Sequence, residues 1–221
     1  MSPPAWRTAL AVLLSCGVVG AAAWLVFFSP VLGVRDIAVS GNSLLPAERI
    51  RQAAAVPDHE PLATVDLDQV RRRISALPEI ESARVERNWP GTLVVHVVER
   101  RPVALVQWGG RTSVVDRHGV AMEPTGVVPL PTLQVPRFAS GDPATGAALA
   151  VAAGLPDDLA RKVRAVRATT ARDVTLALSD GRTIMWGGAE RTGEKARVAL
   201  TLLRRPGDSY DVSSPDVVSV K

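Results

Sequence analysis

An uncharged apolar run near the N-terminus is the feature that most constrains this chain. The run reads ALAVLLSCGVVGAAAWLVFF and covers residues 9–28. At about 1.5 Å per residue, a helix of this length spans about 30 Å, the hydrocarbon thickness of a bilayer. Trp6 precedes the run, and Trp24, Phe27 and Phe28 lie near its other end, where interfacial aromatics are expected. The sequence has no second run of this kind, so it predicts a single transmembrane helix inserted in the lipid bilayer.

The residues before this helix set its expected orientation. Residues 1–8 carry Arg7 and the α-amino group but no acid, so the positive-inside rule places them in the cytoplasm as a short tail. The rest of the chain would then lie outside. A cleaved signal peptide is the alternative, because the alanines at 21–23 fit a small-residue cleavage site. The apolar sequence WLVFF continues past that site, which favours a retained anchor.

Composition limits the kinds of partner. The net charge of +4 is spread along 221 residues, whereas nucleic-acid binders concentrate basic residues on one face. The densest basic run, Arg71-Arg72-Arg73, would fan around a helix, and we interpret it as a solvated helix face in preference to a patch for an anionic partner. The single cysteine, Cys16, excludes an intrachain disulfide and a multi-cysteine zinc site. We expect no nucleic-acid partner.

Catalytic signatures are sparse. The sequence contains no G-x-S-x-G, no G-x-G-x-x-G and no Walker loop. His59, His96 and His118 are too far apart in sequence for a metal-binding pair on one helix. Asp66 and Asp68 are better explained as acids that stabilise a helix N-terminus. We therefore expect no catalytic, metal-binding or cofactor-binding residue; a secreted or anchored cell-wall enzyme with an unrecognised site is the alternative.

After a linker at 29–33, residues 34–104 predict a small domain with the order β-α-α-β-β. Its strands are expected at 34–40, 80–89 and 92–98, and its helices at 46–56 and 67–77. Asp66 and Gln69 resemble a capping box for the second helix. Leu67, Val70, Ile74 and Leu77 share one face of that helix. Pro90-Gly91 predicts a type II turn between the last two strands.

Residues 105–221 predict a mostly antiparallel β domain with flanking helices, so the whole chain is assigned to the α+β class. Asp142 is expected to cap an alanine-rich helix, and a second helix is expected over residues 190–205. The chain ends on a short β-branched segment, Val217–Val220. This segment could be an edge strand whose N–H and C=O groups are open to another chain, or it could close the sheet internally.

Several motifs resemble the FtsQ/DivIB family of bacterial cell-division proteins. The V-x-x-I-x-V-x-G-N string that begins at Val34 resembles the start of a POTRA domain. The strings R-N-W-P-x-T-L, from Arg87, and E-R-R-P-V-A, from Glu99, resemble the end of that domain and the domain junction. Val115-Asp116, Lys195-Ala196 and the D-V-S-x-P string from Asp211 resemble the β domain of the family. The resemblance covers nearly the whole chain.

The resemblance implies a non-enzymatic scaffold of the division machinery, in the cytoplasmic membrane at the septum. Family members bind the single-pass proteins FtsB and FtsL and help control the septal peptidoglycan synthase pair FtsW and FtsI. The FtsB contact uses the last strand of the β domain and nearby residues. Carried onto this chain, those residues are Tyr210, Ser214, Asp216, Val217, Val218, Ser219 and Val220. In the family, a basic residue also opens the strand that leads into the Asp-Gly hairpin. This residue maps to Arg172, and Arg167 is the competing alignment.

Two departures from the family bear on these expectations. The expected cytoplasmic tail is short, so cytoplasmic partners of longer-tailed members are not expected here. The sequence also stops just after the last expected strand, so contacts through a C-terminal extension are not expected. A POTRA module of an outer-membrane assembly protein would require a membrane barrel of many strands, and the segment after residue 104 is too short for one.

Overall fold

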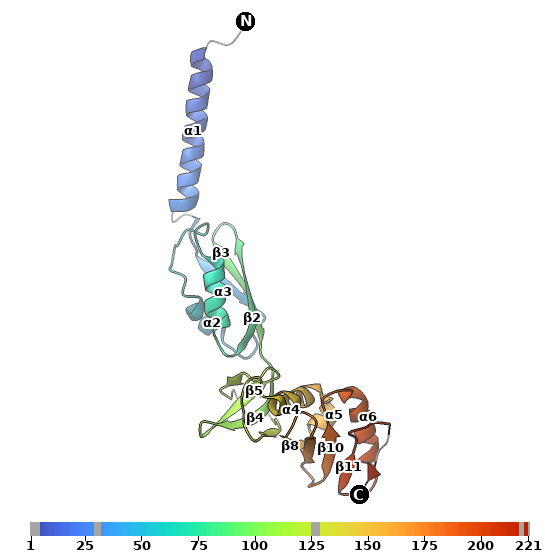
Figure 1. Cartoon of the computed structure of the whole chain (residues 1–221). Coiled ribbons are helices and arrows are strands. Elements are labelled where there is room, and N and C mark those ends of the chain that lie inside the picture. The colour runs from blue at the N-terminus through green and yellow to red at the C-terminus, as the bar shows by residue number, and fades with distance from the viewer. Residues whose placement is uncertain (1–4, 29–31, 125–128, 217–218, 221) are drawn as a thin grey trace. The chain divides into compact units, whose positions relative to one another are not determined.

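The computed structural model describes residues 5–28, 32–124, 129–216 and 219–220. Helix α1 (Ala5–Phe28) contains the stretch Trp6–Phe27, which is long and apolar enough to cross a membrane. The remainder forms sheet-containing domains (Figure 1). By internal contacts the chain divides into two compact units, Met1–Glu99 and Arg100–Lys221. The predicted domain limits at 34–104 and 105–221 stay predictions.

The first unit contains a three-stranded sheet with two helices packed on it, in the predicted order β-α-α-β-β. The central strand β3 (Thr92–Glu99) pairs in parallel with β1 (Asp36–Ser40) and antiparallel with β2 (Ile80–Asn88). Helices α2 (Ala47–Ala54) and α3 (Leu67–Ser75) connect β1 to β2. Strands β1 and β2 are therefore the two edges of this sheet.

Helix α3 buries the face that its periodicity predicts. Val70 and Ile74 are 3% and 0% exposed, and Leu67 and Leu77 pack against the same core. The carboxylate of Asp66 accepts a hydrogen bond from the Gln69 N–H at 3.0 Å, which caps the helix as expected. The local signals in this segment agree with one another, and the helix forms where they place it.

The turn between β2 and β3 differs from the predicted type II turn. A type II turn requires a positive φ at its glycine, and Gly91 does not have one, while the Trp89–Pro90 peptide bond is cis. Glycine is required here for a different reason. A Cβ on Gly91 would lie 2.9 Å from the carbonyl oxygen of Gly33, and the Gly91 carbonyl accepts a hydrogen bond from the Arg35 N–H at 2.8 Å.

The second unit is built on a nine-stranded mixed sheet with the order β12-β11-β10-β9-β8-β7-β4-β5-β6. Most strand pairs are antiparallel, as predicted, whereas β4–β7, β7–β8 and β10–β11 are parallel. The strands are β4 (Pro102–Trp108), β5 (Arg111–Asp116), β6 (Ala121–Met122), β7 (Thr132–Gln134), β8 (Val163–Ala168), β9 (Val174–Leu178), β10 (Thr183–Gly187), β11 (Ser209–Asp211) and β12 (Ser219–Val220).

Three helices accompany this sheet: α4 (Pro143–Gly154), α5 (Asp157–Ala160) and α6 (Thr192–Leu202). Asp142 caps α4 as predicted, with its carboxylate accepting from the Thr145 N–H at 2.8 Å. The short helix α5 was not expected from the sequence. Helix α6 buries Ala199 and Leu202, and it also buries Lys195, whose Nζ donates to the Gly188 carbonyl at 2.9 Å.

Candidate functional site: the terminal edge of the sheet

Strand β12 occupies one edge of the nine-stranded sheet and pairs antiparallel with β11. Its two residues, Ser219 and Val220, lie opposite Asp211 and Tyr210. The backbones of Asp208 and Val212 are bonded to β10, so Asp211 directs its N–H and C=O toward Ser219 on the other side. By the same alternation, Val220 directs its N–H and C=O away from the sheet. The predicted partner residues Val217 and Val218 lie outside the described residues.

Tyr210 is placed differently from its expected role as a partner contact. Its side chain is fully buried, and its hydroxyl lies 2.7 Å from the Arg205 carbonyl oxygen and 3.0 Å from that of Gly207. Arg182 donates to the same hydroxyl at 3.1 Å, with its guanidinium carbon 5.7 Å from the ring centre. This side chain is therefore not available to a partner. It holds β11 in place, and β11 is the strand with which β12 pairs.

Asp216 is exposed in the turn before β12, and Arg191 binds it. Arg191 Nη1 lies 2.8 Å from Asp216 Oδ2, and Nη2 lies 3.2 Å from Oδ1. This hydrogen-bonded pair lowers the pKa of the Asp216 carboxyl below its ordinary value. Arg191 also contacts Glu194 at 2.7 Å and has a left-handed backbone, with φ of 55°, at the start of α6. The two residues are far apart in sequence, and no local pattern pointed to Arg191.

Two further predicted residues are exposed at one end of the sheet. Ser214 lies in the bend after β11, and Arg172 lies in the turn before β9. The start of β9 pairs with the end of β10 at Gly187, and a Cβ on Gly187 would lie 2.9 Å from the Cβ of Ser213. The structure thus brings Arg172, Ser214 and Asp216 to the same end of the sheet. The competing residue, Arg167, lies within β8 and donates to Gln134 Oε1 at 2.6 Å.

The histidines do not gather into a site. His96 lies on β3, where its Nδ1 is 2.7 Å from the Ser40 hydroxyl oxygen, and His118 follows β5. Across the described ranges, no group of three His, Cys, Asp or Glu side chains could hold a metal ion. The chemistry that the terminal edge offers is backbone hydrogen bonding beside exposed charged side chains.

The fold and this open edge define the class of protein: a POTRA domain and a second β domain that follow one apolar helix. A family profile for the "POTRA domain, FtsQ-type" matches residues 32–100, and one for "Cell division protein FtsQ/DivIB, C-terminal" matches residues 104–217. The chain belongs to the FtsQ/DivIB family of cell-division proteins.

Relatives named "Cell division protein FtsQ" support the same assignment. The protein from Mycolicibacterium smegmatis is 41% identical over 199 residues, which are 89% of this chain and 60% of the relative. The one from Mycobacteroides abscessus is 40% identical, over 96% of this chain and 68% of the relative. The one from Streptomyces bingchenggensis is 38% identical, over 98% of this chain and 87% of the relative. The chain thus spans about three fifths of the length of the M. smegmatis relative.

Proposed function

We propose that the chain is a non-enzymatic, single-pass scaffold of the division machinery at the septum. It has its N-terminus inside and its POTRA and β domains outside. In this proposal it binds single-pass division proteins resembling FtsB and FtsL, and through them it helps control septal peptidoglycan synthesis by FtsW and FtsI. Membership in a family of cell-division proteins supports the division role.

The observation that carries the proposed binding mode is the outward backbone of β12. An extended partner segment added here gains main-chain hydrogen bonds to Val220. Exposed Arg172, Ser214 and Asp216 lie at one end of the same sheet and supply side-chain selectivity. Tyr210 contributes only by holding β11 in place.

A binding isotherm tests this mode. The full chain, in nanodiscs, is titrated with the extracytoplasmic segment of the FtsB-like protein of the same organism. Val220→Pro removes the outward N–H and should weaken binding at least tenfold, about 1.4 kcal/mol, whereas Val220→Ala keeps the N–H and should bind nearly as the parent does. Val218→Pro tests the preceding part of the segment.

Charge reversal tests the side-chain contribution. Arg172→Glu should weaken the same complex, and the loss should shrink at high salt. Arg164→Glu makes the same charge change elsewhere on the sheet and is the matched control, and Arg167→Glu tests the competing alignment. If a folded Val220→Pro variant bound the partner with unchanged affinity, the docking site would lie elsewhere on the protein. Failure of a fluorescent fusion to gather at septa would reject the division role itself.

A further inference from the structure

The nine-stranded sheet opens between β4 and β7. These parallel strands pair at one position, Leu105 with Thr132, where the Leu105 N–H donates to the Pro131 carbonyl at 2.8 Å. On its other side β4 remains paired with β5 as far as Trp108, and β7 remains paired with β8 as far as Gln134. Strands β4 and β7, each still paired with its other neighbour, therefore separate from each other after a single residue pair.

This separation creates a strand edge inside the sheet. Backbone groups alternate in direction along a strand, so Gln107 directs its N–H and C=O to the same side as Leu105. The ladder with β7 ends before Gln107, and among the described residues no strand pairs with that side of it. The edge is separate from the terminal edge at β12, because β4 and β12 are at distant positions in the sheet order.

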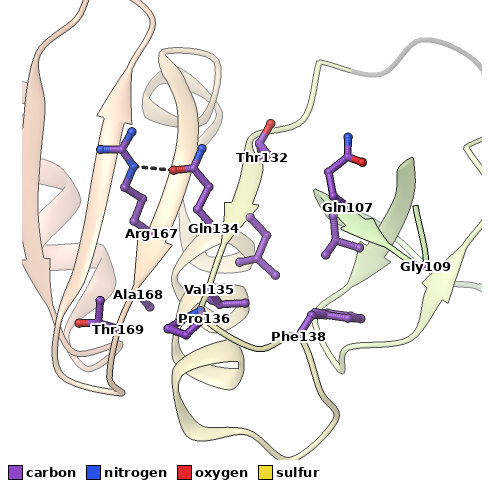
Figure 2. A pocket seen from close by; sticks show the side chains of 12 residues that line it. Gln107, Gly109, Thr132, Gln134, Val135, Pro136, Phe138, Arg167, Ala168 and Thr169 are labelled. Atoms are coloured by element: carbon purple, nitrogen blue, oxygen red, sulfur yellow. Dashed lines mark hydrogen bonds between the residues drawn. The ribbon is translucent and has the colours of Figure 1, made fainter. Parts of the chain in front are cut away.

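A groove of about 710 Å³ lies along this edge (Figure 2). Val106 and Leu133, 3% and 5% exposed, line it from the core side. Phe138 lies at the end of the groove away from Thr132, and Gln107 lies across it from Gln134. The groove thus combines an apolar surface with an open backbone edge, which is what an extended peptide uses when it adds to a sheet.

The charge of the groove comes from one residue. Arg167, on β8, is the only charged side chain among the described residues that line it. Its Nε donates to Gln134 Oε1 at 2.6 Å, which orients the guanidinium group beside the groove (Figure 2). Within the described parts of the chain, Arg167 has no carboxylate partner. An oriented guanidinium without an anion favours a carboxylate ligand.

We propose that this groove binds an extended acidic segment of a partner protein, adding as a strand to β4. The backbone of the segment bonds to Gln107, alternate apolar side chains pack on Val106, Leu133 and Phe138, and an acidic side chain between them pairs with Arg167. Charge complementarity selects this occupant, since the described lining of the groove contains the cation of Arg167 and no carboxylate. The proposal goes beyond the terminal edge because it assigns a second interaction surface.

A designed peptide tests the groove in the full chain in nanodiscs. The labelled hexapeptide TVEVTS has alternating valines and one glutamate, and TVQVTS differs only in lacking the charge. We expect saturable binding by fluorescence anisotropy, with TVEVTS at least tenfold tighter than TVQVTS at low salt. Arg167→Gln should remove this preference, whereas Arg164→Gln, an exposed change on the same strand outside the groove, should keep it.

Amide hydrogen exchange locates the peptide. Added TVEVTS should slow exchange at Gln107 and leave Val220 unchanged. Gln107→Pro removes an N–H that does not face β5, so it should weaken both peptides at least tenfold with little change in melting temperature. If the peptide protects Val220 instead of Gln107, fails to bind at millimolar concentration, or binds independently of Arg167, the proposal is wrong. Even if Gln107→Pro does not fold, amide exchange at Gln107 and Val220 in the parent protein shows where the peptide binds.

Discussion

Arg191 binds Asp216 with both terminal nitrogens of its guanidinium group, at 2.8 and 3.2 Å. This contact joins the start of α6 to the turn that leads into β12. Bidentate pairing fixes orientation as well as charge, so it limits how far the turn before the edge strand can move. Because both side chains are exposed, we expect the contact to order the edge locally and to leave the rest of the domain unaffected.

The first prediction concerns this contact. Asp216→Asn removes the charge and should speed amide exchange at Ser219, whose N–H faces Asp211 on β11. The melting temperature should barely change. Glu194→Gln removes the other carboxylate that Arg191 contacts, at 2.7 Å, and is the control that should leave Ser219 exchange unchanged. Equal effects of the two variants would show that Asp216 does not hold the edge.

The second prediction concerns the buried face of α3. Ile74 is 0% exposed, so Ile74→Asp would place a carboxylate in the core of the first unit. An unpaired buried charge costs several kcal/mol, which is comparable to the stability of a small domain. We expect rapid proteolysis between residues 34 and 99 under conditions in which the parent protein resists cleavage. Equal resistance of the variant would contradict the packing of this helix.

The third prediction separates two neighbouring arginines. Arg73 Nη1 donates to the carbonyls of Ala54 and Ala55, at 3.2 and 3.0 Å, and so satisfies the C-terminal end of α2. Arg73→Ala should therefore destabilise the first unit by about 0.5–1.5 kcal/mol, measured by amide exchange at Val95 in β3. Arg72→Ala changes an exposed residue and should stay within about 0.5 kcal/mol of the parent. Similar losses would argue against the capping role.

These contacts show which features the sequence could predict. The face of α3 and the caps at Asp66 and Asp142 depend on residues a few positions apart, so periodicity and capping rules were sufficient. The arginine run predicts a solvated helix face, whereas the carbonyl that Arg73 caps belongs to another helix, so no local pattern reveals this contact. Gly91 has the residue type of a type II turn, but its role depends on Gly33, which is distant in sequence.

The candidate site was predictable only in part. The sequence left open whether the terminal segment forms an edge strand or closes the sheet internally, and the structure puts β12 at a sheet edge. The inward direction of Tyr210 depends on the parallel pairing of β11 with β10, which no local pattern reveals. The contact of Arg191 with Asp216 and the separation of β4 from β7 also depend on pairing between distant segments, and no local pattern reveals them. Long-range pairing decides which side chains face outward, and single-sequence signals are local.

The last prediction concerns pH and the carboxylate of Glu99. Its oxygens accept hydrogen bonds from the N–H groups of Ser43, Leu44 and Leu45 and from the Ser43 hydroxyl, at 2.7–3.1 Å. Burial alone would raise the pKa of Glu99, but the hydrogen bonds from Leu45, Leu44 and Ser43 together outweigh it, so the pKa lies below the ordinary 4.5. The ionised form therefore stabilises the loop between β1 and α2.

A depressed pKa fixes the sign of the pH dependence. The stabilisation is complete above the ordinary pKa of glutamate and is lost as the pH falls through the lower pKa of the folded state. Glu99→Gln should speed amide exchange at Leu45 several-fold at pH 7, and this ratio should approach one as the pH is lowered below 4.5. Glu86→Gln, an exposed change on β2, should show no such trend. A ratio that stays constant down to pH 3 would mean that the charge of Glu99 does not hold this loop.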